Sequence, residues 1–179
     1  RIRSGLKKIA PLFSMKDVEQ VCKQFQPVEY DDLISITDCF TARFVEAGHI
    51  LGSSSIELFE NEGSEKRKLV FSGDLGPFNT PLMRDPARIE SADVVFLEST
   101  YGDRDHKSLT ESIEELKEVL AKAKALSGKV LIPTFAVGRT QQIIYHISRL
   151  FESGELEPYP VFLDSPMGIA ATQIYVKHT

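Results

Sequence analysis

The clearest fold signal in this chain is the stretch Asp93-Val94-Val95-Phe96-Leu97-Glu98-Ser99-Thr100-Tyr101-Gly102-Asp103-Arg104. Its apolar run Val94–Leu97 is short, continuous and bounded by acids, which is typical of a strand buried on both faces. Polar residues begin abruptly at Glu98, and strand ends in α/β proteins often carry functional groups. An internal loop in which Arg104 pairs with a neighbouring aspartate explains the same polarity equally well. The stretch alone therefore leaves both interpretations open.

Strand and helix patterns alternate downstream of this strand. The segment Leu109–Leu126 predicts a long amphipathic helix, because its apolar residues recur on one face and acids crowd its first half. The segment Lys129–Ile132 predicts another buried strand, Thr140–Phe151 a second helix, and Val161–Leu163 a third strand. This order is typical of an α/β fold with a parallel sheet, in which crossovers are right-handed.

The upstream part of the chain carries antiparallel signals instead. Residues 15–25 predict a short amphipathic helix that begins after Ser14 and ends before Pro27. Short strands are predicted for Ile34–Thr37, Thr41–Glu46, Ser54–Glu60 and Lys68–Ser72. The polar residues Asn61–Lys66 between the last two predict a hairpin turn.

Composition places the chain among ordinary soluble globular proteins, with 42% hydrophobic and 26% charged residues. The net charge of −5 does not favour nucleic-acid binding. The one basic cluster, Arg1, Arg3, Lys7 and Lys8, is best explained as a solvent-exposed chain end. No apolar run approaches the roughly 20 residues that span a bilayer. Cys22 and Cys39 lack the CxxC spacing of a zinc finger or redox motif, so a reducing cytoplasm is the simplest setting.

Two further residues are candidates for chemistry. His49 lies on a glycine-flanked turn after a predicted strand, where a ligand has room beside it, and imidazole is the usual zinc ligand. A histidine hydrogen-bonded within the turn explains the segment somewhat better when it is considered alone. Asp74 follows the strand Lys68–Ser72, where it suits a functional carboxylate or an ordinary turn cap.

Taken together and in order, these segments resemble the successive motifs of one known family. Glu46–Ser53, Ser72–Gly76 and Glu98–Arg104 are similar to motifs of the β-CASP nucleases, which have the metallo-β-lactamase fold. The later strings Ile132–Gln141 and Leu163–Met167 resemble the opening of the β-CASP insertion. The resemblance extends over most of the chain, from about residue 28 to 170. The string Thr100-Tyr101-Gly102-Asp103 is most similar to the RNA-processing branch of the family.

The resemblance implies an α/β chain in two parts. Residues 1–103 are expected to form the later portion of a metallo-β-lactamase αββα sandwich, and residues 104–179 the first part of a parallel-sheet β-CASP domain. By the same resemblance, His49 binds one zinc ion and Asp74 bridges two. Glu98 corresponds to the motif A acid, which holds the site together and positions a catalytic histidine.

The implied reaction is metal-assisted hydrolysis of a phosphodiester, with RNA as the expected substrate and DNA less favoured. The family's main ligand motif, His-x-His-x-Asp-His, does not occur in this sequence, and neither do its motif B and motif C histidines. A zinc ion needs three or four protein ligands, which His49 and Asp74 alone cannot supply. The chain by itself is therefore expected to be an incomplete piece, metal-poor and inactive.

Two other functions are considered beside the nuclease. A non-catalytic β-CASP subunit that serves as a scaffold in an RNA-processing complex is the main alternative, and the intact His49, Asp74 and Glu98 argue against it. A small-molecule hydrolase of the metallo-β-lactamase fold does not explain the α/β region after Arg104. We further expect a cytoplasmic protein without membrane contact, and a homodimer is plausible because half a domain exposes apolar strand faces.

Overall fold

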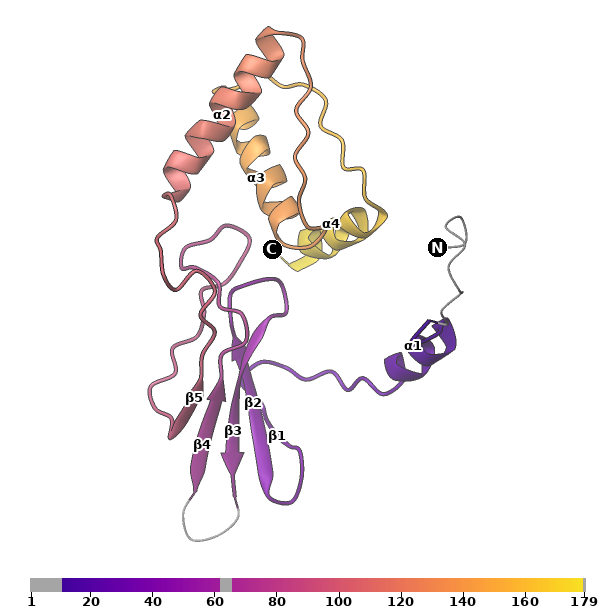
Figure 1. The fold of residues 1–179 in the computed structure, drawn as a ribbon, viewed down its shortest axis with the longest axis vertical. Helices are drawn as coiled ribbons and strands as arrows, with labels where there is room; N and C mark the ends of the chain where they lie inside the picture. The colour runs from indigo at the N-terminus through magenta and orange to yellow at the C-terminus, as the bar shows by residue number, and fades with distance from the viewer. Residues whose placement is uncertain (1–10, 62–65, 179) are drawn as a thin grey trace, which may run out of the picture.

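The chain forms a mixed sheet followed by a group of helices in residues 11–61 and 66–178, which the computed structural model describes (Figure 1). The strands are β1 (Leu33–Ser35), β2 (Phe40–Glu46), β3 (Ser54–Glu60), β4 (Arg67–Phe71) and β5 (Val94–Phe96). The helices are α1 (Met15–Cys22), α2 (Leu109–Ala125), α3 (Arg139–Glu152) and α4 (Pro166–His178). The mixture of sheet and helices confirms the α/β class.

The five strands lie in the order β1-β2-β3-β4-β5. The first four pair antiparallel with their neighbours, and β5 pairs parallel with β4, so that Phe71 lies opposite Phe96 and their rings stack at 4.6 Å. The predicted strand Ser54–Glu60 has the bounds of β3, and the other predicted strands of this part differ by one or two residues. The predicted hairpin of β3 and β4 is confirmed, although residues 62–65 of its turn lie outside the described residues, as does the basic cluster of residues 1–10.

A buried carboxylate ties the three central strands together. Glu57 on β3 is only 1% exposed and lies 2.5 Å from both Arg43 Nε on β2 and Lys68 Nζ on β4. Burial alone would raise the pKa of Glu57, but the hydrogen bonds from Arg43 and Lys68 outweigh it and hold that pKa below its ordinary value. Glu57 therefore stays ionised within the sheet, beside the buried Val45 and Val70.

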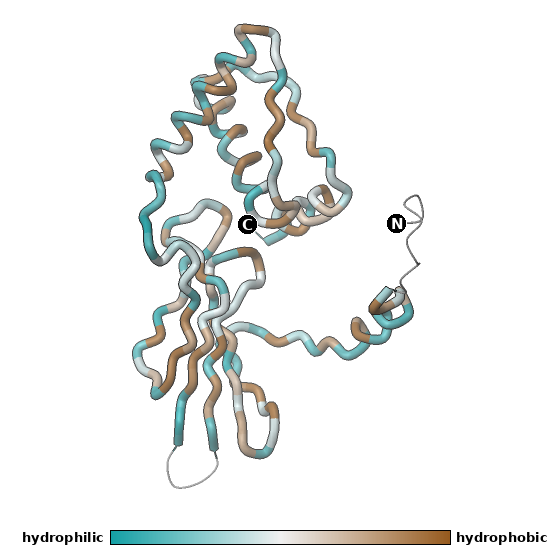
Figure 2. The backbone as a smooth tube through the Cα atoms, in the orientation of Figure 1, coloured by the Kyte–Doolittle hydropathy of each residue, from teal (hydrophilic) through white to brown (hydrophobic). Residues whose placement is uncertain are grey.

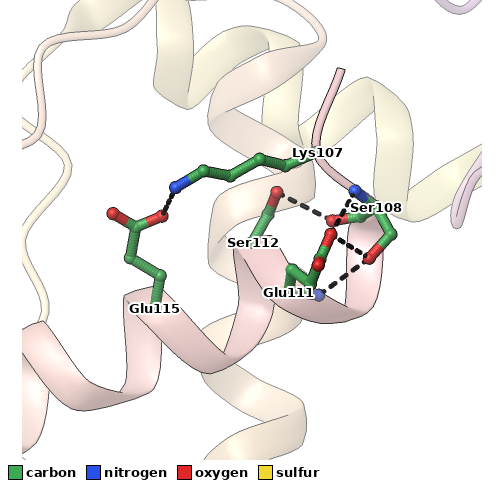
Figure 3. Close-up of polar contacts among 5 residues, drawn as sticks. All are labelled: Lys107, Ser108, Glu111, Ser112 and Glu115. Carbon is green, nitrogen blue, oxygen red and sulfur yellow. Dashed lines mark hydrogen bonds and ion pairs between the residues drawn. The ribbon is translucent and has the colours of Figure 1, made fainter. Parts of the chain in front are cut away.

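Helix α2 begins at a complete capping box, which Figure 3 shows in detail. Ser108 Oγ accepts a hydrogen bond from the backbone N–H of Glu111 at 3.2 Å, and the Glu111 carboxylate accepts one from the Ser108 N–H at 2.9 Å. Lys107 adds an ion pair to Glu115, one turn further on, at 2.8 Å. These bonds satisfy backbone donors that the first turn of a helix leaves without partners, so the helix starts as sharply as its sequence predicts.

A hydrophobic core lies between α2 and α3, which run side by side in Figure 1. Its buried members are Leu120 on α2, Ile147 and Leu150 on α3, and Leu156 in the following loop. The apolar stripes predicted for the two helices thus face each other. Helix α1, in contrast, has no buried residue and lies away from the sheet. None of the described helices combines the length and the apolar character needed to cross a bilayer.

The predicted parallel strands after residue 93 are only partly correct. Val94–Phe96 forms β5, but the prediction that this strand is buried on both faces is wrong, since Val95 is 55% exposed and Leu97 67%. In the described part of the chain β5 pairs with β4 alone, so one of its edges and much of its side-chain surface face solvent. Residues 129–132 and 161–163 are extended, yet they form no strand, because neither has a hydrogen-bonding neighbour among the described residues.

Helix α4 was not expected from the sequence. Ser165 caps it, since its Oγ accepts from the Gly168 N–H at 3.0 Å, and Pro166 occupies the first helical position, where its fixed φ suits a helix. The apolar residues of α4 are spread around the helix and do not gather on one face, so its sequence lacks the amphipathic pattern that would reveal it. Its buried Tyr175 contacts the loops above the sheet.

Candidate metal centre

The first part of the candidate site is the loop of residues 47–53, here called the His49 loop, which joins β2 to β3. Ser53 Oγ accepts hydrogen bonds from the backbone N–H groups of His49 at 3.0 Å and Ile50 at 3.2 Å. The Gly48 N–H donates to a Glu46 carboxylate oxygen at 2.8 Å. These bonds close the loop on itself, and they leave the His49 ring on its outer side, 45% exposed.

The second part is the loop of residues 72–76 after β4, here called the Asp74 loop. Its Gly76 N–H donates to the Ala47 carbonyl at 2.8 Å, so the two loops touch through their backbones. A Cβ on Gly76 would lie 1.8 Å from the Gly48 carbonyl oxygen, a separation that no side chain can adopt. Only glycine permits this approach, which brings Asp74 beside His49.

His49 and Asp74 lie close enough to share a ligand. His49 Nε2 is 3.9 Å from Asp74 Oδ2, and the Asp74 side chain is 73% exposed. Both polar groups are thus accessible from solvent. The two residues are 25 positions apart in sequence, and adjacent strands of the sheet bring them together.

Glu98 fixes the Asp74 loop from β5. Its carboxylate accepts a hydrogen bond from the Leu75 N–H at 2.5 Å, and its own N–H donates to Ser72 Oγ at 3.0 Å. The hydrogen bond from the Leu75 N–H is the main cause that holds the pKa of Glu98 below its ordinary value, and the hydrogen bond from Thr100 is the second. Glu98 is therefore an ionised carboxylate that binds the backbone next to Asp74.

The pair fits part of a zinc site. Imidazole nitrogen and carboxylate oxygen are both common zinc donors, and in tetrahedral coordination two such atoms lie about 3.4 Å apart. The observed 3.9 Å is close to this value and needs only a small side-chain adjustment. In residues 11–61 and 66–178, however, no three His, Cys, Asp or Glu side chains gather as a metal site requires. These two residues would therefore be a partial set of ligands.

All three predicted site residues lie at the same end of the sheet, in the loops that follow β2, β4 and β5. Two supporting residues were missed by sequence reasoning. Ser72 joins the strand ends, because its buried hydroxyl accepts from Glu98 and donates to the Gly73 carbonyl at 2.7 Å. Gly76 permits the contact of the two loops. Both belong to the quoted string Ser72–Gly76, but a string of residues does not show which backbone they will touch.

Comparison with known proteins shows which family this chain resembles. The family model described as Beta-Casp domain matches residues 140–179. A ribonuclease of Thermus thermophilus is 39% identical over 168 residues, which cover 93% of this chain and 37% of that protein. This chain belongs to the β-CASP family. An RNase J-like protein of Methanocaldococcus jannaschii is 34% identical over 93% of the chain and 39% of its own length.

Other β-CASP relatives carry names from transcription. The transcription termination factor FttA of Thermococcus kodakarensis is 33% identical over 174 residues, which are 95% of this chain and 26% of that factor. The chain thus spans between 26% and 39% of the length of these three relatives. The matched regions cover 93% to 95% of this chain.

Proposed function

We propose that this chain provides part of the active site of a zinc-dependent ribonuclease. The observation that supports this most directly is the placement of His49 Nε2 3.9 Å from Asp74 Oδ2, between two loops that a glycine contact holds together. The names of the relatives, a ribonuclease and an RNase J-like protein, favour RNA as the substrate. In this proposal residues 1–103 belong to a metallo-β-lactamase domain and residues 104–179 begin the β-CASP domain.

His49 and Asp74 would hold the metal in this site. His49 would be a ligand of one zinc ion, and Asp74, whose side chain is 73% exposed, would bridge two. Bound zinc would supply Lewis-acid stabilisation of the negative charge on a scissile phosphate. The remaining ligands would come from outside the residues described above, since the pair accounts for only two donors. The 179-residue chain alone is accordingly proposed to bind little metal and to have no activity.

Glu98 would act by holding Asp74 in place. It binds the Leu75 backbone N–H, so it fixes the residue directly after Asp74. Its lowered pKa keeps it ionised at neutral pH, and a charged acceptor forms a stronger hydrogen bond than a neutral one. A loop fixed from β5 presents its carboxylate at a constant position relative to β2 and β3. Glu98 is therefore proposed to affect turnover more than metal binding.

The alternative of a non-catalytic scaffold predicts a different use of the same residues. A scaffold needs the loops to be folded but has no need for two exposed donors within 4 Å of each other. The exposed Asp74 makes little contribution to packing, so its position is better explained by a ligand. The nuclease is thus the function that this site supports best.

The test uses the full product of the gene that encodes this chain, with zinc content and cleavage of a labelled RNA as the two readouts. Asp74→Ala should lower both, with turnover falling at least about 100-fold, because the charge that faces the metal ions is lost. Glu98→Gln should lower turnover by about tenfold or more and leave zinc content close to wild type, since glutamine keeps an acceptor but loses the charge.

The matched control is Asp32→Ala, which removes an exposed carboxylate just before β1 and should change neither readout. Wild-type turnover in Asp74→Ala would rule out the ligand role. A wild-type product that contains zinc in no preparation and cleaves no RNA would favour the scaffold instead.

A further inference from the structure

The helical part of the chain contacts the His49 loop at two points. One contact comes from Tyr175 on α4, and the other from the turn before α3. The His49 loop carries the proposed zinc ligand, His49, on its outer side. The contacts of this loop therefore decide where the His49 ring lies. None of the sequence motifs that indicate the family includes Tyr175, and its role has to come from the structure.

Tyr175 reaches the loop with its hydroxyl group. The Leu51 backbone N–H donates to Tyr175 Oη at 3.2 Å, across 124 positions of sequence. The same hydroxyl donates to Met83 Sδ at 4.0 Å, in the segment that follows the Asp74 loop. The Tyr175 side chain is buried, at 4% exposure, so water does not replace these bonds easily. One hydroxyl therefore connects α4 to two segments beside the candidate site.

The turn before α3 reinforces this contact. Gly138 has a φ of 85° and is buried, and a Cβ there would lie 2.9 Å from Ile50 Cγ2. Gln141 holds this turn, since its Oε1 accepts from the Gly138 N–H at 2.8 Å, and its Nε2 donates to Thr172 Oγ1 on α4 at 3.0 Å. The turn and α4 are thus connected through Gln141. Together they contact Ile50 and Leu51, the two residues directly after His49.

We propose that Tyr175 is a positioning residue for His49. It holds the Leu51 amide, two residues from the ligand, and so couples the region matched by the β-CASP model to the metal ligand on the sheet. The inference rests on the proposed function for the role of His49 as a ligand, but the contact itself can be tested without metal. Tyr175 acts on the site through its contacts with Leu51 in the His49 loop and with Met83 after the Asp74 loop, and the hydrogen bond to Leu51 is the one closest to His49.

The first measurement is amide hydrogen exchange by NMR on the 179-residue chain. Tyr175→Phe removes the acceptor of the Leu51 N–H and keeps the ring, so exchange at Leu51 should become roughly three- to tenfold faster. The matched control is Tyr159→Phe. Within the described residues the Tyr159 hydroxyl is buried without a hydrogen-bond partner while its ring packs on Phe151, so its loss should leave Leu51 unchanged.

The second measurement is the zinc dissociation constant of the full gene product, determined by competition with a chelator. Tyr175→Phe should raise it by about three- to tenfold and Tyr159→Phe should not, while both variants melt close to wild type. Unchanged exchange at Leu51, or equal acceleration at amides throughout the chain, overturns the positioning role. If the wild-type product binds no zinc, the proposed function fails, whereas an acceleration confined to Leu51 still supports the loop contact.

Discussion

At the scale of single residues, the candidate site depends on one backbone contact. Gly76 and Ala47 are hydrogen-bonded, and no atom larger than hydrogen fits on the Gly76 Cα. The contact holds the two loops against each other, beside the pairing of β3 with β4 and the hydrogen bond from Ser55 to the Ser72 carbonyl. A single methyl group at Gly76 must therefore displace one loop, and Asp74 or His49 with it.

We predict that Gly76→Ala destabilises the chain by about 2–4 kcal/mol, since its Cβ would overlap the Gly48 carbonyl and the backbone must shift. Urea denaturation at neutral pH measures this. The control is Gly128→Ala, where the nearest atom to a new Cβ is 3.4 Å away and no strained φ is required, so its effect should stay within about 0.5 kcal/mol. Equal stabilities of the two variants would contradict the close approach.

At the scale of elements, an ion triad around one buried carboxylate connects the three central strands of the sheet. Glu57 connects β2, β3 and β4 through Arg43 and Lys68, and all three strands lead into or out of the loops of the site. An ionised carboxylate at this depth is costly unless both its oxygens are paired. Here each oxygen has one cation, so the ion triad stabilises the sheet only while Glu57 is charged.

The pH dependence of stability follows from the lowered pKa of Glu57. Between the pKa of Glu57 in the folded state and its unfolded value of about 4.5, the unfolded state binds more protons than the folded state. The stability that ionised Glu57 contributes is therefore fully present above pH 4.5. It is lost as the pH falls through the folded pKa. Glu57→Gln should cost about 2 kcal/mol at pH 7 and flatten this acid dependence. Chemical denaturation at several pH values tests it.

The exposed Glu90→Gln provides the comparison for Glu57, and it should retain the wild-type profile. If Glu57→Gln showed the same loss of stability at low pH as the wild type, other carboxylates would account for the acid dependence.

At the scale of the whole molecule, much apolar surface remains uncovered. In the segment before α3, Leu131 is 91% and Phe135 85% exposed. Phe162, in the segment of residues 161–163 before α4, is 88% exposed. Figure 2 shows the hydrophobic character of residues 129–132, which run beside the helices without a covering layer. Surfaces of this kind favour association with another apolar surface.

We predict that the 179-residue chain self-associates, with a second copy covering these segments. Sedimentation velocity over a range of concentrations should show the sedimentation coefficient rising with concentration. Replacement of Leu131 and Phe162 by serine should weaken this, whereas Leu12→Ser, at an equally exposed site before α1, should not. A coefficient independent of concentration in the wild type would contradict the prediction.

Sequence reasoning was most accurate where local patterns suffice. Strand β3 alternates polar and apolar residues, and helix α2 has a capping box and a single apolar stripe, so both were predicted almost to the residue. It was least accurate for residues 129–132 and 161–163. Their apolar runs are typical of buried strands, but a strand also requires a hydrogen-bonding neighbour, which a local pattern does not reveal.

Residue types and their order were enough to predict the α/β class, the family resemblance and the three candidate residues. Only the folded structure shows that His49 and Asp74 are neighbours, that Glu98 accepts a hydrogen bond from the Leu75 amide, and that Tyr175 contacts the His49 loop. The physical reason is that hydrogen bonds and close contacts depend on distances in space. Residues 51 and 175 become partners only once α4 packs against the loops of the sheet.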